Sequence, residues 1–167
     1  MRRAALACKT MTTTHTDIPV RLDFDGHAPS FSAAMSRLDG AATKELDRVG
    51  FGARLRELVR LRASQLNGCA YCVNMHSGDA RAAGESETRL ALLPVWRETA
   101  LFDERERAAL ALTEAITLVA ETHVPEAAWQ SAAEEFSAGE LGALVGLIVT
   151  INAWNAIGVS TRAWPVA

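Results

Sequence analysis

The 167-residue sequence lacks several features that mark particular classes of protein. Its three cysteines are too few for a disulfide-dense secreted scaffold. It contains no block of lysine and arginine, and its formal net charge of −3 does not indicate a nucleic-acid partner or an anionic membrane surface. No glycine-rich phosphate loop or dinucleotide fingerprint is visible, so we expect no NAD, flavin, ATP or other cofactor. What remains is ordinary globular composition, with 49% hydrophobic and 22% charged residues.

The N-terminal stretch is too short to be a secretory signal. After two arginines, residues 4–8 form an apolar run of five residues, whereas a signal needs about 7–15. We interpret residues 1–10 as a loose tail, or as a segment that precedes an alternative translation start at Met11. Cys8 then has no expected role.

A second apolar run, Leu141–Val159, is nearly as long as the roughly 20 residues that cross a bilayer. It contains Thr150, Asn152 and Asn155, which are costly in a single membrane span. The run therefore indicates a central helix of a helical bundle, and we expect a cytoplasmic protein with no membrane partner. Buried asparagines need hydrogen-bond partners, which we expect to come from helix–helix or subunit contacts.

The sequence predicts an all-α single domain of about seven helices. Alanine is abundant, and the alternation typical of strands is absent apart from a possible short stretch at 18–20. We expect residues 1–27 to form a tail and connecting arm, and residues 28–167 to form the helical domain. Caps, glycines and prolines place the helices at 29–38, 41–48, 53–66, 69–83, a short segment from 86 that Pro94 breaks, 103–121, 125–136 and 137–162.

A Cys-x-x-Cys pair followed by a histidine is the strongest chemical signal in the chain. A helix that begins at or just after Cys69 places Cys69, Cys72 and His76 on one face. The helix dipole and the neighbouring thiol both favour a reactive thiolate, and His76 can accept a proton from Cys72. Because a break at Asn67-Gly68 separates the two helices, Glu57 on the preceding helix can fold back and orient His76.

Two other interpretations of these residues stay open. The cysteines can be inert residues of the core, as free cysteines often are. Alternatively, Cys69, Cys72, His76 and Glu57 are all suitable zinc ligands. Structural zinc sites usually take two pairs of ligands from separate segments, and no second pair is present, so we expect no bound metal.

At these residues the sequence resembles the AhpD-like alkylhydroperoxidase branch of the carboxymuconolactone decarboxylase superfamily. The shared pattern is a glutamate, eleven intervening residues, and then Cys-x-x-Cys-x-x-x-His, which Glu57, Cys69, Cys72 and His76 match. The resemblance covers about residues 30–160. It extends to three surrounding segments, which are Arg60–Gly68, Glu104–Glu114 and Ile151–Asn155.

The resemblance implies an all-helical fold, assembly into trimers or hexamers, and thiol-dependent peroxidase or disulfide-reductase activity. It implies that Cys72 attacks the hydroperoxide and that Cys69 resolves the resulting sulfenic acid as a disulfide. His76 would accept the proton, with Glu57 as its partner in the relay. An external dithiol, on a lipoyl domain or a thioredoxin-like protein, would restore the enzyme.

One residue departs from the pattern of the best-known AhpD-type peroxidases. They carry a histidine of the proton relay just before the second cysteine, where this chain has Tyr71. Tyrosine, with an ordinary pKa of about 10, is a poor base near neutral pH. The alternatives to a peroxidase are a redox-sensing or zinc-binding assembly without turnover, or a general protein disulfide reductase.

Overall fold

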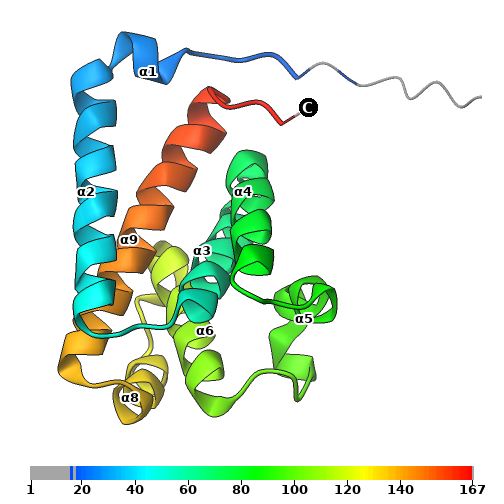
Figure 1. The fold of residues 1–167 in the computed structure, drawn as a ribbon, viewed down its shortest axis with the longest axis vertical. Helices are drawn as coiled ribbons and strands as arrows, with labels where there is room; N and C mark the ends of the chain where they lie inside the picture. The colour runs from blue at the N-terminus through cyan, green and yellow to red at the C-terminus, as the bar shows by residue number, and fades with distance from the viewer. Residues whose placement is uncertain (1–15, 17, 167) are drawn as a thin grey trace, which may run out of the picture.

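The computed structural model describes residue 16 and residues 18–166, and over that range the chain is helical with no strand (Figure 1). The expectations for Cys8 and Met11 concern residues outside this range. The helices are α1 (Phe24–His27), α2 (Pro29–Arg48), α3 (Ala53–Asn67), α4 (Ala70–Ala82), α5 (Glu87–Leu92), a 3-10 helix η1 (Leu93–Glu98), α6 (Glu104–Thr117), α7 (Val119–Thr122), α8 (Glu126–Glu135) and α9 (Ala138–Thr161).

The long helix α9 packs against α2, α3 and α6. By length and composition it could cross a membrane, with a mean hydropathy of 1.6 over its most apolar window. Its polar side chains instead have partners in the bundle, and Leu144, Leu147 and Ile148 are fully buried in the core. A capping box between Ser137 and Glu140 begins the helix, as the sequence indicates.

Two predicted helix ends are wrong. The expected stop at Gly40 does not occur, because α2 continues through it to Arg48. A glycine costs a helix only about 1 kcal/mol relative to alanine, and Met35, Ala42 and Leu46 bury one continuous face on both sides of Gly40. The predicted helix over 103–121 is divided, since the backbone of Leu118 leaves helical geometry between α6 and α7.

The asparagines of α9 have the helix–helix partners that were expected. Asn155 is fully buried and donates to the hydroxyl oxygen of Ser64, with the two atoms 3.0 Å apart. The side-chain nitrogen of Asn67 lies 2.7 Å from Oδ1 of Asn152 and 3.0 Å from Oδ1 of Asn155. These bonds attach the C-terminal end of α3 to α9, directly before the turn that leads to Cys69.

Replacing Asn155 with alanine is expected to lower the free energy of unfolding by about 1–3 kcal/mol, because the partners lose buried hydrogen bonds. Urea unfolding followed by circular dichroism measures the change. Val149→Ala, at a half-exposed position of the same helix, is the matched control and should change stability much less. Equal losses in the two variants would contradict a stabilising role for the asparagine network.

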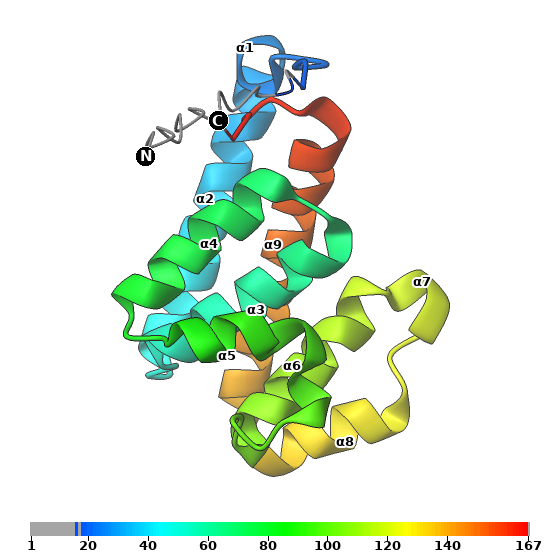
Figure 2. The ribbon, with the colours of Figure 1, turned by 90° about the vertical axis from the view of Figure 1, so that its right-hand side faces the viewer.

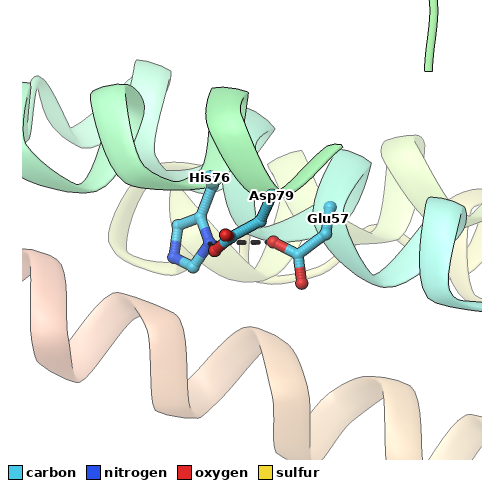
Figure 3. Close-up of side chains that lie close together, drawn as sticks. All are labelled: Glu57, His76 and Asp79. Carbon is cyan, nitrogen blue, oxygen red and sulfur yellow. Dashed lines mark hydrogen bonds and ion pairs between the residues drawn. The ribbon is translucent and has the colours of Figure 1, made fainter. Parts of the chain in front are cut away.

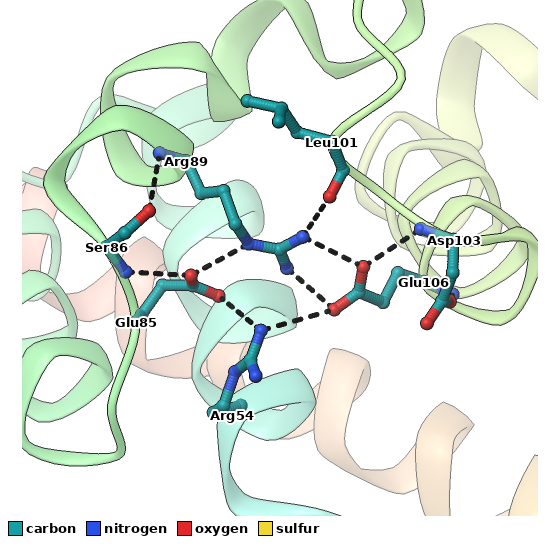
Figure 4. A network of polar contacts seen from close by, with 7 residues as sticks. All are labelled: Arg54, Glu85, Ser86, Arg89, Leu101, Asp103 and Glu106. Atoms are coloured by element: carbon teal, nitrogen blue, oxygen red, sulfur yellow. Dashed lines mark hydrogen bonds and ion pairs between the residues drawn. The ribbon is translucent and has the colours of Figure 1, made fainter.

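A partly buried ion-pair network fixes the segment between α5 and α6 (Figure 4). Arg89 donates to Oε1 of Glu85 at 2.8 Å and to Oε1 of Glu106 at 2.6 Å, and it also binds the carbonyl oxygen of Leu101. Arg54 on α3 lies 3.7 Å from the second carboxylate oxygen of Glu85. The network joins α3, α5 and α6 at the end of the molecule away from Cys69.

The N-terminal arm and the C-terminal end of the chain lie side by side (Figure 2). The backbone N–H groups of Arg21 and Leu22 donate to the carbonyl oxygen of Thr161, at 2.8 and 3.1 Å. The indole of Trp164 donates to Oδ2 of Asp25 on α1 at 2.9 Å. These contacts hold α1 and the end of α9 together next to α4.

Candidate functional site

A tight turn between α3 and α4 places the two cysteines. Gly68 ends α3 in the left-handed region, with φ of +68°, which confirms the break predicted at Asn67-Gly68. Cys69 follows with an extended backbone and caps the N-terminus of α4, so the helix begins one residue later, at Ala70. Cys72 therefore lies in the first turn of α4, near the positive end of the helix dipole.

The sulfur atoms of Cys69 and Cys72 are joined as a disulfide, with the Cα atoms 5.3 Å apart. Both residues are buried, and the backbone N–H of Cys72 donates to Sγ of Cys69 at 3.4 Å. Gly158 of α9 packs directly against this pair. A Cβ atom at Gly158 would lie 3.1 Å from Sγ of Cys69, so a larger residue here would push the sulfur and α9 apart by a few tenths of an ångström.

Glu57 of α3 and His76 of α4 form the predicted contact. Oε2 of Glu57 lies 2.9 Å from Nδ1 of His76, and Oε1 accepts a hydrogen bond from Arg60 at 2.6 Å. An ionised carboxylate only accepts, so in a neutral His76 the proton sits on Nδ1. This leaves Nε2 as a proton acceptor. Nε2 is buried and has no hydrogen-bond partner among the residues that the structure describes.

Glu57 is held in its ionised form. Burial raises the pKa of its carboxyl, but the hydrogen bond with His76 and the positive charge of Arg60 together outweigh burial. The net result is a pKa below the ordinary value of 4.5. Glu57 therefore stays an acceptor at neutral pH and keeps the His76 ring in one orientation.

This pKa predicts how stability changes with acid. Because the folded pKa is below that of the unfolded chain, the ionised Glu57 stabilises the fold above about pH 4.5. That contribution is lost as the pH falls below 4.5 and through the folded pKa. Glu57→Gln should lower the free energy of unfolding by about 1–3 kcal/mol at pH 7, and the difference from the wild type should shrink as the pH falls toward 3.

Urea unfolding at pH 7, 5, 4 and 3 checks this dependence for the wild type and Glu57→Gln side by side. The comparison is needed because Glu85 and Glu114 also have lowered pKa values and contribute to acid sensitivity in both proteins. A difference between the two proteins that is the same at every pH would contradict the assignment to Glu57.

A cavity of about 620 Å³ lies over Cys72 and His76. Its aromatic wall consists of Tyr71, Trp154 and Trp164, with ring centroids 5.5 Å apart for Tyr71–Trp164 and 5.7 Å for Trp154–Trp164. Polar residues of α1 and α2 complete the cavity, and no motif or spacing in the sequence indicated them. They are Asp25, Ser32, Ser36, Asp39 and Thr43.

The structure shows which aromatic residues and histidines line the cavity and which lie elsewhere. Trp154 and Trp164 line the cavity, whereas Trp96 lies in the core, where its indole donates to Glu114. Tyr71 points its ring to the cavity and packs on Trp164. His27, which ends α1, is not among the residues that line the cavity.

A metal ion would have to use a different set of ligands from the one considered above. Within the part of the chain that the structure describes, Glu57, His76 and Asp79 offer ligand atoms within 4.8 Å of one another (Figure 3). The cysteine sulfurs are bonded to each other and do not join this group. The Arg60 guanidinium, 2.6 Å from Glu57, would compete with a cation.

Comparisons with known proteins agree with this fold. The model of the carboxymuconolactone decarboxylase family matches residues 29–115. The uncharacterized protein YdfG of Bacillus subtilis is 41% identical over 105 residues, covering 63% of this chain and 71% of that protein.

Two crystal structures have the same fold. One is a protein of unknown function from Agrobacterium tumefaciens, described in relation to the antioxidant defence protein AhpD, with a TM-score of 0.82 and 35% identity over 89% of this chain and all of that one. The other is a peroxidase-related protein from Ralstonia eutropha with an alkylhydroperoxidase AhpD core, with a TM-score of 0.72 and 20% identity over 85% of this chain and 74% of that one. The chain therefore belongs to the carboxymuconolactone decarboxylase family, in its AhpD-like branch.

Proposed function

We propose that this protein is a thiol-dependent hydroperoxide reductase in which Cys69 and Cys72 alternate between dithiol and disulfide. The observation that carries the proposal is the position of His76, which lines the same cavity as Cys72 one helical turn away. Glu57 binds its Nδ1, and its Nε2 has no hydrogen-bond partner among the described residues. A thiol, a proton acceptor and a carboxylate that orients it are the parts that activate a cysteine nucleophile. The family resemblance and the AhpD-like neighbours support an antioxidant role.

The reaction begins with the dithiol form. His76 takes the thiol proton of Cys72 on Nε2, and the thiolate attacks the terminal oxygen of the hydroperoxide. The O–O bond breaks, the sulfur becomes a sulfenic acid, and the proton on His76 passes to the leaving alkoxide to give an alcohol. The thiol of Cys69 then attacks the sulfenic sulfur, a disulfide forms, and water leaves. Each cycle thus oxidises two thiols and reduces one peroxide bond.

The positions of the two cysteines support the assignment of their roles. Cys72 lines the cavity, whereas Cys69 packs against Gly158 behind it. As the N-cap residue, Cys69 receives the N–H of Cys72, which stabilises negative charge on its sulfur. Cys69 is therefore the better leaving group when an external dithiol attacks Cys72 from the cavity and reduces the disulfide.

The proposal extends to the partners of this cycle. A dithiol reductant, on a lipoyl domain or a thioredoxin-like protein, supplies the two electrons for each turnover. A reducing compartment such as the cytoplasm keeps that reductant available. As the family resemblance implies, the assembly is a homo-oligomer, a trimer or a hexamer.

A single-turnover experiment tests this function. Reduced protein with Cys8 replaced by serine receives one equivalent of cumene hydroperoxide, and peroxide loss is followed together with intact mass. Stoichiometric loss of peroxide with the mass decrease of two hydrogens is the expected result. Persistent peroxide and an unchanged mass would rule out peroxide reduction. The next experiments would then measure the reduction of small disulfides, as expected of a general disulfide reductase, and the zinc content of the protein.

A further inference from the structure

The cavity over Cys72 has an unequal distribution of charge. Four of the residues that line it are charged, three aspartates and one arginine, besides the titratable His76. Asp25 comes from α1, Asp39 from α2 and Asp79 from α4, so three helices direct carboxylates to the same space. Asp39 and Asp79 are both partly exposed, and solvent reaches them at the rim.

The single arginine does not balance these aspartates, because it is already paired. Arg60 donates to Oε1 of Glu57 at 2.6 Å, and the side chains of both residues are largely buried. The distance from Arg60 to Asp39 is longer, at 3.8 Å. The charges of Arg60 and Glu57 cancel, which leaves the three aspartates as the net charge that a molecule in the cavity meets.

Hydrogen bonds hold the Asp25 carboxylate in place and keep it ionised. It accepts from the hydroxyl of Ser32 at 2.6 Å and from the indole of Trp164 at 2.9 Å. These bonds hold the pKa of its carboxyl below the ordinary value of 3.8. The hydrogen bond from Trp164 to Asp25 also holds the Trp164 ring beside Tyr71 and Trp154. Aromatic rings and carboxylates therefore border one space. Aromatic faces attract cations, as carboxylates do.

We propose that this cavity selects cationic organic substrates and disfavours anionic ones, with Asp39 and Asp79 as specificity-determining residues. The inference rests on the proposed function, since it concerns what reaches the thiolate of Cys72. His76 lines this cavity next to Cys72, and its buried Nε2 has no hydrogen-bond partner within the described part of the chain. Its volume of about 620 Å³ is in the range of small-molecule sites. Hydroperoxides or disulfides with an ammonium group beside an apolar body fit this description.

Matched reagents of different charge test the selection without peroxide turnover. The trimethylammonium-ethyl, sulfonatoethyl and methyl esters of methanethiosulfonate carry positive, negative and no charge. In each case the Cys72 thiolate attacks the sulfenyl sulfur, a mixed disulfide forms, and methanesulfinate leaves. Protein with Cys8→Ser and Cys69→Ser leaves Cys72 as the remaining thiol, so that the mixed disulfide persists and intact mass follows the rate.

The expected result is a ratio of cationic to anionic rates about tenfold above that of N-acetylcysteine amide at low ionic strength. Asp39→Asn with Asp79→Asn should reduce this excess to about twofold or threefold. About 1 M salt, with a Debye length near 3 Å, should have a similar effect without any substitution. The high-salt measurement uses no aspartate substitution, so its result does not depend on whether the Asp39→Asn, Asp79→Asn variant folds.

Glu134→Gln with Glu135→Gln is the control for net charge. Both residues are exposed on α8, which lies at the opposite end of the molecule from α1 (Figure 1). This pair should leave the ratio unchanged. A fast neutral reaction with no excess of the cationic rate would overturn the charge selection and leave the proposed function standing. A slow reaction with all three reagents would overturn both, because Cys72 would then not be an accessible thiolate.

Discussion

Cys72→Ser is expected to lower the rate of peroxide reduction by at least about 10³-fold, the largest effect of any single substitution in this protein. The serine hydroxyl has a much higher pKa than a thiol and does not form a stable product with the peroxide oxygen. Cys69 does not replace it, because Cys69 packs against Gly158 and does not line the cavity. Peroxide loss in a single turnover measures the effect.

Cys69→Ser is the matched variant, and it should behave differently. Cys72 still attacks the peroxide once, so one equivalent is consumed, but no thiol remains beside it to form the disulfide. A sulfenic acid should therefore accumulate, and dimedone should trap it as a mass increase in this variant. The roles are reversed if Cys72→Ser accumulates the sulfenic acid and Cys69→Ser leaves the peroxide intact.

His76→Ala is expected to slow the reaction of Cys72 with peroxide by about 10²-fold at pH 7, because it removes the proton acceptor. The loss should shrink as the pH rises past about 8.5, the ordinary pKa of a cysteine thiol, since hydroxide then forms the thiolate directly. Stopped-flow rates from pH 6 to 10 give this profile. A merely structural role for His76 predicts a loss that does not change with pH.

Glu57→Gln separates orientation from proton transfer. Glutamine has nearly the same shape and still offers an oxygen to Nδ1 of His76, but it has no charge to stabilise the imidazolium or to balance Arg60. We expect a smaller loss than for His76→Ala, about tenfold, with the pH profile displaced to higher pH. A rate and profile equal to those of the wild type would show that the carboxylate charge is not needed.

The sequence by itself determined the end of α3 and the start of α4 around Cys69 and Cys72. Asn67-Gly68 ends one helix because glycine accepts a left-handed backbone, and the next helix begins directly after it. Spacings of three and four residues then place Cys69, Cys72 and His76 on one face. These signals are local, so they can be identified without knowledge of the rest of the chain. Where two local signals competed, as at Gly40, burial of a continuous helix face decided the outcome.

The walls of the cavity over Cys72 were decided only by the tertiary structure. The hydrogen bond between Trp164 and Asp25 joins residues 139 positions apart, and no local spacing predicts it. Asp25, Asp39 and Trp154 come from three different helices, and each by itself is an ordinary exposed or packing residue. They border one space because α9 packs against α2 and α3, while the N-terminal arm is hydrogen-bonded to the end of α9. Packing of the apolar helix faces is a collective property of the chain, so the charge and the walls of the cavity follow from the fold and not from any motif.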